Sequence, residues 1–171
     1  MGKNINANQG PNCHSYLSRG AKVSGGTSEI IDIDSPEGWC KFYGVKVSKG
    51  MALVYKAVDS NYMSERGTSY APGSTPQAPD WDGGIKECGG GLHFSPTPRM
   101  ALCFNSSATK FLGCWVKLGD LRGGNESDHY PEKCKSKGVA VPCFEVDING
   151  EVMGKRKFPL KGLNGELKSP S

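Results

Sequence analysis

The segment GGGLHFSP, residues 89–96, combines residue types that could bind a ligand or carry chemistry. Three successive glycines lack Cβ atoms, so they tolerate positive φ and let a ligand approach the backbone, as in a cradle of N–H groups around an anion. The alternative interpretation of the glycines is a mobile turn that enters a strand. His93 and Ser95 follow closely, and an imidazole can stack on a ring or exchange a proton near neutral pH. We therefore expect the functional centre of the chain around this segment.

A long connection precedes this segment. Residues 59–91 contain GTSYAPGSTPQAPDWDGG, which has too many prolines and glycines for a regular helix or strand. Loops of this length in compact domains are usually functional, because ordering them costs entropy that a simple connection does not require. Asp80 and Asp82 flank Trp81, so PDWDGG places two carboxylates beside an aromatic platform, and we interpret it as a candidate lid.

Composition and motifs exclude several classes of protein. The net charge of +4 comes from 21 basic and 17 acidic residues, a surplus that permits an anionic ligand but is not the dense basic face of a dedicated nucleic-acid binder. Walker, GxSxG, HExxH and GxGxxG motifs do not occur. No apolar run approaches the roughly 18 to 20 residues of a membrane-spanning helix, and the N-terminus lacks the apolar centre of a signal peptide. We expect a cytoplasmic protein with no membrane partner.

The cysteines predict neither a disulfide framework nor a zinc knuckle, because their number is odd and no CxxC pair occurs. Most are expected to be small buried hydrophobic residues. A metal site that joins Cys88 and His93 to a distant ligand is the alternative, and our prediction is no metal. The seven cysteines stand at positions 13, 40, 88, 103, 114, 134 and 143.

Short strands must position these residues, because 24 glycines and 11 prolines leave little room for long helices. The fold class that we predict is α+β, mainly β, with split antiparallel sheets, few short helices and long Gly/Pro-rich loops. Alternation and β-propensity predict strands at residues 39–47, 51–58, 92–95, 111–118 and 137–150. We expect 51–58 to be central and 137–150 to be an edge or bulged strand, because Pro142 interrupts it.

One short helix is predicted in PTPRMALCFN, residues 96–105. Either Ser95 or Thr97 would cap its N-terminus, with Pro98 in the first turn. Met100, Ala101 and Phe104 would face inward. The whole domain is predicted to span residues 29–154, after a flexible arm at 1–28 and before a tail at 155–171.

The order of VYKAV, a long loop, GGGLHFSPTPRMALCF and FLGCWVKLGDL resembles the ADP-ribosyltransferase fold, in particular the catalytic domains of poly-ADP-ribose polymerases. The resemblance covers about residues 50–147. It implies NAD as the cofactor and transfer of ADP-ribose to a macromolecule. It places Tyr55 and Lys56 at the first-strand motif that grips the nicotinamide ribose, with Lys56 where the family has His or Arg. His93 falls where a Tyr stacks on nicotinamide.

The same resemblance implies the remaining site roles. Lys56, His93 and Glu145 are the candidate catalytic residues. In the family a Glu opens the strand that here begins near Gly138, so Glu132 and Glu145 are the nearest carboxylates. The candidate NAD-binding residues are Tyr55, Trp81, Gly90, Gly91, His93 and Ser95.

The chain also looks like uncharacterised proteins of phages and their bacterial hosts, in which the phrases CGGGLHFSP and EVD recur. This second likeness favours a different class of function, a non-catalytic phage or mobile-element module that binds a host protein or nucleic acid. A structural protein of a particle is a third hypothesis, because the chain combines glycine-rich loops with an N-terminal arm. The first resemblance predicts a nucleotide ligand, and the second predicts a macromolecular partner.

Overall fold

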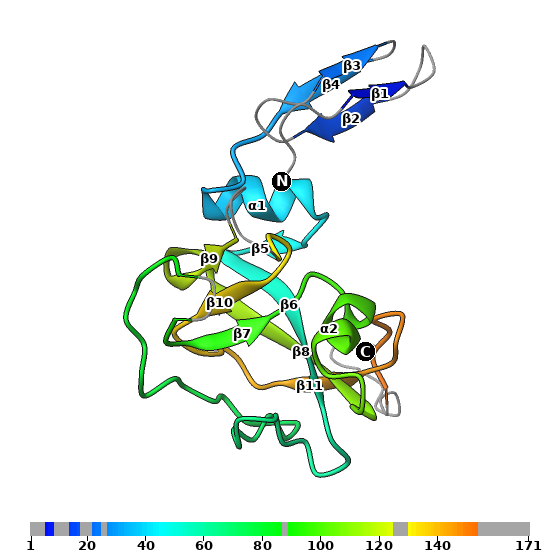
Figure 1. Cartoon of the computed structure of the whole chain (residues 1–171). Coiled ribbons are helices and arrows are strands. Elements are labelled where there is room, and N and C mark those ends of the chain that lie inside the picture. The colour runs from blue at the N-terminus through cyan, green and yellow to red at the C-terminus, as the bar shows by residue number, and fades with distance from the viewer. Residues whose placement is uncertain are drawn as a thin grey trace, which may run out of the picture.

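Two long antiparallel strands, β6 (Met51–Val58) and β8 (Lys110–Lys117), form the centre of the structure (Figure 1). The structure is a computed structural model that describes residues 31–86, 89–124 and 130–153, and the backbone of four short strands before residue 31. Every residue of β6 pairs with one of β8. The short strands β5 (Val47–Ser48) and β11 (Phe144–Val146) complete a sheet in the order β11-β8-β6-β5. The prediction of a central strand at 51–58 is confirmed.

A second, smaller sheet carries the glycine-rich segment. It consists of β7 (Leu92–Phe94), β10 (Cys134–Ser136) and β9 (Arg122–Gly123) in the antiparallel order β7-β10-β9. One face of this sheet packs into the interior, where Leu92 and Phe94 are buried. Strand formation by LHFS is therefore confirmed in all but its last residue, while β10 was not predicted.

Two short helices flank the central sheet. Helix α2 (Pro98–Phe104) confirms the predicted helix, and Thr97 rather than Ser95 is its cap, because the Thr97 side chain accepts a hydrogen bond from the Met100 N–H at 3.1 Å. Ala101 is buried as expected, whereas Met100 and Phe104 are half-buried. A turn of 3₁₀ helix, η1 (Leu118–Asp120), follows β8.

The strand predicted at residues 39–47 is wrong, because helix α1 (Pro36–Phe42) occupies most of it. Ser35 caps this helix by accepting a hydrogen bond from the Gly38 N–H at 3.0 Å, and Pro36 fits the first helical position. Trp39 and Cys40 are both buried, although neighbours in a half-buried strand point to opposite faces. The capping signal in SPEG outweighed the alternation of the residues that follow.

The strand predicted at residues 137–150 is much shorter than expected. Only Phe144–Val146 forms a strand, and it lies at the edge of the sheet, as Pro142 indicated. The preceding residues make isolated contacts instead, such as the Ala140 N–H bond to the Trp115 carbonyl at 2.7 Å. The described part of the long connection, 59–86 and 89–91, contains no helix or strand, in agreement with the prediction.

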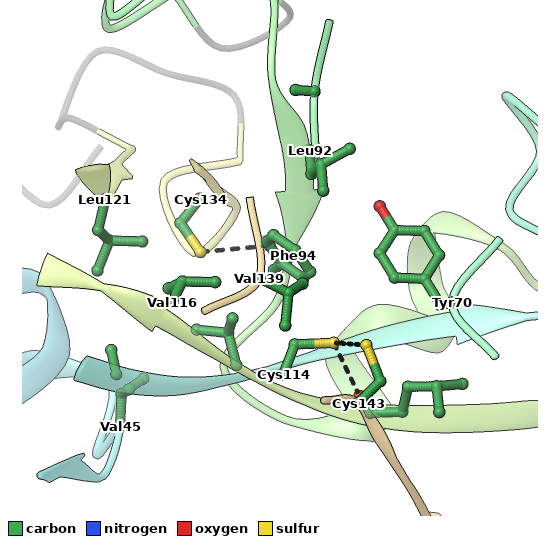
Figure 2. Packing of buried hydrophobic residues seen from close by; sticks show 14 of the residues in the cluster. Val45, Tyr70, Leu92, Phe94, Cys114, Val116, Leu121, Cys134, Val139 and Cys143 are labelled. Atoms are coloured by element: carbon green, nitrogen blue, oxygen red, sulfur yellow. Dashed lines mark hydrogen bonds between the residues drawn. The ribbon is translucent and has the colours of Figure 1, made fainter. Parts of the chain in front are cut away.

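The main hydrophobic core lies between the two sheets (Figure 2). Trp39, Phe94, Leu112 and Leu121 are among its fully buried members. Most cysteines are buried, as predicted, and the exception among the described residues is the exposed Cys103. Cys13 and Cys88 lie outside the described residues. The buried cysteines are Cys40, Cys114, Cys134 and Cys143.

Four short strands precede α1 and pair only with one another, as two parallel pairs, β1-β3 and β2-β4. The tail predicted at 155–171 lies outside the described residues. In the described part of the chain no helix has the length and apolarity to cross a membrane. The architecture is therefore α+β and mainly β, with two α-helices and antiparallel main sheets. The bounds of the four strands are Asn6–Asn8 for β1, His14–Leu17 for β2, Lys22–Ser24 for β3 and Thr27–Ile30 for β4.

Candidate functional site

A backbone bridge joins the two sheets and assembles the candidate site. Tyr55 in β6 and Ser95 after β7 exchange two backbone hydrogen bonds, of 2.9 and 3.0 Å. The bridge sets β6 beside β7, the strands that carry Lys56 and His93. Residues separated by a long loop in the sequence thus become neighbours.

A cavity of about 150 Å³ opens where the sheets meet, which we call the basic pocket. Tyr55, Lys56, His93 and Ser95, all predicted site residues, line it. The cavity is smaller than the roughly 300 to 1,000 Å³ of sites that enclose a drug-sized ligand. It therefore fits one end of a larger molecule. Further lining residues include Glu65, Arg66, Phe104, Asn105 and Lys133.

Lys56 is the charged group at the inner end of the basic pocket. Its Nζ donates a hydrogen bond of 2.8 Å to the His93 carbonyl and lies 5.5 Å from the centre of the Tyr70 ring. Burial is the main cause that lowers the pKa of Lys56 to about 8, with Cys114 opposing the shift and the nearby charges of Arg66 and Lys133 adding to it. An anion in the pocket would favour the charged ammonium and reverse this shift.

His93 offers an unused polar atom beside Lys56. Its Nε2 is buried and has no hydrogen-bond partner among the described residues. Burial lowers the pKa of His93 to about 4, with smaller contributions from Lys133, Lys56 and Arg66. The ring is therefore neutral near pH 7. A buried polar atom without a partner costs free energy, and because Nε2 is buried, the ring must turn toward the cavity before a ligand can bond to it.

The pocket has more positive than negative charge. Lys56, Arg66 and Lys133 line it, and Glu65, which is exposed, is the carboxylate among its described lining residues. Lys133 also lies over the Phe104 ring, 5.3 Å from its centre. This charge balance, together with the neutral imidazole and the Ser95 and Asn105 side chains, suits a ligand that carries an anionic group.

Trp81, Gly90 and Gly91 lie together, but they do not line the basic pocket. Residues 80–84 form what we call the Trp81 loop, which is held against the glycine turn. Asp82 Oδ2 accepts the Gly90 N–H at 3.1 Å, and Asp80 Oδ1 accepts the Gly91 N–H at 3.2 Å. The predicted cradle of glycine N–H groups does hold anions, and these are two carboxylates of the chain itself.

The close approach of the Trp81 loop explains the run of glycines. A Cβ on Gly90 would collide with the Asp80 backbone carbonyl, and one on Gly91 would lie 3.0 Å from the Trp81 ring. Gly91 also has a φ of +126°, which side chains disfavour. Gly89 is crowded as well, with Lys135 Nζ 2.6 Å from the position of a Cβ. Packing of the loop therefore requires Gly90 and Gly91, whereas at Gly89 the flexible end of Lys135 can move aside.

Glu145 is held away from the basic pocket. Its carboxylate accepts a hydrogen bond of 2.8 Å from the Tyr62 hydroxyl and forms an ion pair of 3.3 Å with Lys110. The other candidate carboxylate, Glu132, lies near Tyr43, whose pKa burial raises to about 12 with a contribution from Glu132. Neither glutamate lines the cavity.

Arg66 and Lys133 contribute charge to the pocket and were missed in the sequence. Lys133 immediately precedes β10, and that strand is too short to show a period of two. Arg66 stands in the long connection, where no pattern indicates which side chains turn inward. The one available signal was that this connection had to serve some function, and it did not identify the residue.

A larger groove of about 390 Å³ lies on the other side of Tyr55. Pro96, Pro98 and Ile148 supply apolar lining, with Lys46 and Arg99 at its edges. It contains none of the buried charged groups of the basic pocket. We therefore place the candidate site at the basic pocket despite its smaller volume.

Comparison of the chain with protein-family models, with curated proteins and with solved structures gives no match. Within the described ranges, no group of three or more His, Cys, Asp or Glu side chains is placed to hold a metal ion. The alternative metal site with Cys88 falls partly outside those ranges. Any functional interpretation therefore depends on the geometry of the pocket.

Proposed function

We propose that this chain is an ADP-ribosyltransferase-like domain that binds NAD or a related nucleotide, with one end of the ligand in the basic pocket. The observation that carries the proposal is that Lys56 and His93 line one cavity together with two further cations, Arg66 and Lys133. These are the residues that the resemblance implies for the nicotinamide end of NAD.

The pocket chemistry supports a ligand with both ring and anionic character. Tyr55 and Phe104 supply aromatic lining for a flat ring, while Lys56 and Arg66 supply charge for a phosphate or carboxylate. Neutral His93 can accept or donate one hydrogen bond through Nε2. A nucleotide joins these features in one molecule.

Ligand binding receives more support than group transfer. Cleavage of the bond between nicotinamide and ribose develops positive charge on the sugar, which a carboxylate must stabilise. Glu145 is engaged by Tyr62 and Lys110 outside the cavity, and the pocket carboxylate is the exposed Glu65. The geometry therefore favours a domain that binds the nucleotide, whether or not it also transfers ADP-ribose.

Thermal-shift titration with NAD and related nucleotides tests the proposal, because a ligand that binds only the folded state raises the melting temperature with concentration. The variants Lys56→Met and His93→Leu should lose most of the shift. Lys117→Met is the matched control, because Lys117 is an exposed lysine at the end of β8 outside the pocket.

An NAD-dependent shift in the wild type and in Lys117→Met, lost in Lys56→Met, would support binding at the pocket. The same shift in all variants would place the ligand elsewhere. Absence of any shift with all nucleotides would refute the proposal. Release of free nicotinamide from NAD, followed by chromatography, then decides whether the bound ligand is turned over.

A further inference from the structure

A row of three side chains, the neutral His93 and the cationic Lys135 and Arg122, crosses the small sheet, and we call it the basic row. Lys135 in β10 stands directly opposite His93 in β7 on one side and Arg122 in β9 on the other. Side chains at directly opposite positions of antiparallel strands share a face and lie about 5 Å apart at Cβ. His93, which lines the basic pocket, is therefore followed on the same face of the small sheet by Lys135 and then Arg122.

The Trp81 loop covers the far part of this row. The Trp81 ring lies 5.5 Å from the Arg122 guanidinium and 6.0 Å from Lys135 Nζ, within the range of cation–π contacts. Asp82 Oδ1 forms an ion pair of 3.2 Å with Lys135. The loop thus presents an aromatic ring and an anion to the basic row.

In the ion pair between Asp82 and Lys135, the carboxylate is exposed to solvent and the ammonium is buried. The Lys135 side chain is 3 % exposed, whereas that of Asp82 is 48 % exposed. A buried ammonium needs an anionic partner, and Asp82 gives up hydrogen bonds from Gly84 and Gly90 when it leaves but is exposed enough to be solvated by water. An external anion with more charge than a carboxylate can therefore compete with Asp82 for Lys135.

We infer that Lys135 and Arg122 form a second subsite for the same ligand, in which a phosphate group replaces the Asp82 carboxylate on Lys135. The inference rests on the proposed function and deepens it, since it assigns the ligand to the class of nucleotides with a diphosphate. The small cavity holds one end, the phosphates extend along the row past His93, and a second ring stacks on Trp81. In the free protein the Trp81 loop fills this subsite.

The Asp82 carboxylate should therefore compete with a ligand that carries a diphosphate, but not with a ligand too short to reach Lys135. Asp82→Asn removes the competing charge. It should raise the affinity for NAD about fivefold, because NAD then no longer has to displace a carboxylate from Lys135. It should leave the affinity for nicotinamide mononucleotide, which has one phosphate, within about twofold. Calorimetric titration measures both.

Two further variants isolate the Lys135 interaction. Asp80→Asn is the matched control, because Asp80 also holds the glycine turn, through Gly91, but among the described residues it forms no ion pair with Lys135. It should not change the ratio of the two affinities. Adding Lys135→Met to Asp82→Asn should abolish the gain for NAD.

The wild type provides a second measurement if Asp82→Asn does not fold. Asp82 Oδ1 accepts the Gly84 N–H at 2.9 Å, so displacement of this carboxylate should speed hydrogen exchange at Gly84. NAD should produce that change and nicotinamide mononucleotide should not.

The outcomes separate this inference from the proposed function. If both nucleotides bind with equal affinity in every variant and Gly84 exchange is unaffected, the second subsite is refuted while the basic pocket stands. If neither nucleotide binds the wild type or Asp82→Asn, both proposals are refuted. A gain for NAD alone in Asp82→Asn, reversed by Lys135→Met, supports the second subsite.

Discussion

The candidate region has two halves, the basic pocket and the part of the small sheet under the Trp81 loop, and they differ in where their counter-charge comes from. At the Trp81 loop, Lys135 pairs with Asp82, and the glycine N–H groups are bonded to Asp80 and Asp82. At the basic pocket, the Lys56 ammonium donates a hydrogen bond to the neutral His93 carbonyl, and His93 Nε2 has no partner among the described residues. The charged groups under the Trp81 loop are paired within the chain, so we call this the satisfied half. Those of the basic pocket are arranged to pair with an anion from outside, so we call it the unsatisfied half.

The pKa values follow the same division. Hydrogen bonds from the Gly84 and Gly90 N–H groups, and then from Lys135, lower the pKa of Asp82 to about 2, so the carboxylate is stabilised by its surroundings. At the pocket, burial lowers the pKa of Lys56 to about 8 and that of His93 to about 4, so the charged forms are disfavoured. A cationic group whose charge is disfavoured by its own fold points to a binding role rather than a structural one.

The largest effect is expected from Gly90→Ala, which breaks the satisfied half. The new Cβ would collide with the Asp80 carbonyl, a backbone atom that cannot move without the Trp81 loop. We expect a loss of at least about 3 kcal/mol in the free energy of unfolding, measured by chemical denaturation. Gly119→Ala is the control, because nothing lies within 4 Å of its Cβ, and it should change stability by less than about 0.5 kcal/mol. Equal effects at both glycines would show that the loop does not pack as described.

Lys56→Met removes the buried charge from the unsatisfied half, and we expect it to increase stability and to decrease ligand affinity. Replacing a buried lysine by an apolar chain of similar length should raise the free energy of unfolding by about 1 kcal/mol or more at pH 7. Affinity for an anionic ligand should fall at the same time, which is typical of functional residues that cost stability. A loss of both stability and affinity would instead make Lys56 a structural residue.

The pH dependence of stability tests the state of His93. A folded pKa of about 4 lies below the ordinary 6.5, so the contribution of this group is complete above pH 6.5 and is lost as the pH falls through 4. The expected loss is on the order of 2 to 3 kcal/mol. Carboxylates also titrate in this range, so the informative quantity is the difference between wild type and His93→Gln in denaturation at pH 7 and pH 4. A difference that does not change with pH would contradict the depressed pKa.

The sequence predicted the elements around the candidate site better than the contacts inside it. The LHFS strand, the 51–58 strand and the capped helix follow from local signals, namely short apolar runs and Thr97 followed by Pro98. The pairing of Tyr55 with Ser95, which assembles the pocket, depends on contacts across the long loop, and no local pattern encodes it. The glycine cradle was recognised as an anion site, but its occupants, Asp80 and Asp82, are chosen by the packing of the tertiary structure.

Where two local sequence signals competed, the prediction followed the wrong one. The residues after Trp39 alternate like a strand, yet the SPEG cap starts a helix that buries Trp39 against Gly123, where a Cβ would collide with the indole. In the same way Glu145 has the position of a catalytic carboxylate by chain order. Its partners, Tyr62 and Lys110, lie far away in the sequence and could not be predicted.

The smallest effect is expected for Glu145→Gln, which should leave both halves of the comparison intact. The ion pair with Lys110 is partly exposed, and glutamine can still accept the Tyr62 hydroxyl bond, so the melting temperature should change by about 2 °C or less. Affinity for NAD should not change, because this carboxylate does not line the pocket.

Glu65→Gln is the informative partner to that variant, because Glu65 does line the pocket and its charge opposes an anionic ligand. Removing it should strengthen NAD binding by about two- to threefold, as expected for one exposed charge near a ligand. If Glu145→Gln weakened binding more than tenfold while Glu65→Gln had no effect, the ligand would lie beside β11, and the assignment of the unsatisfied half to Lys56 and His93 would be wrong.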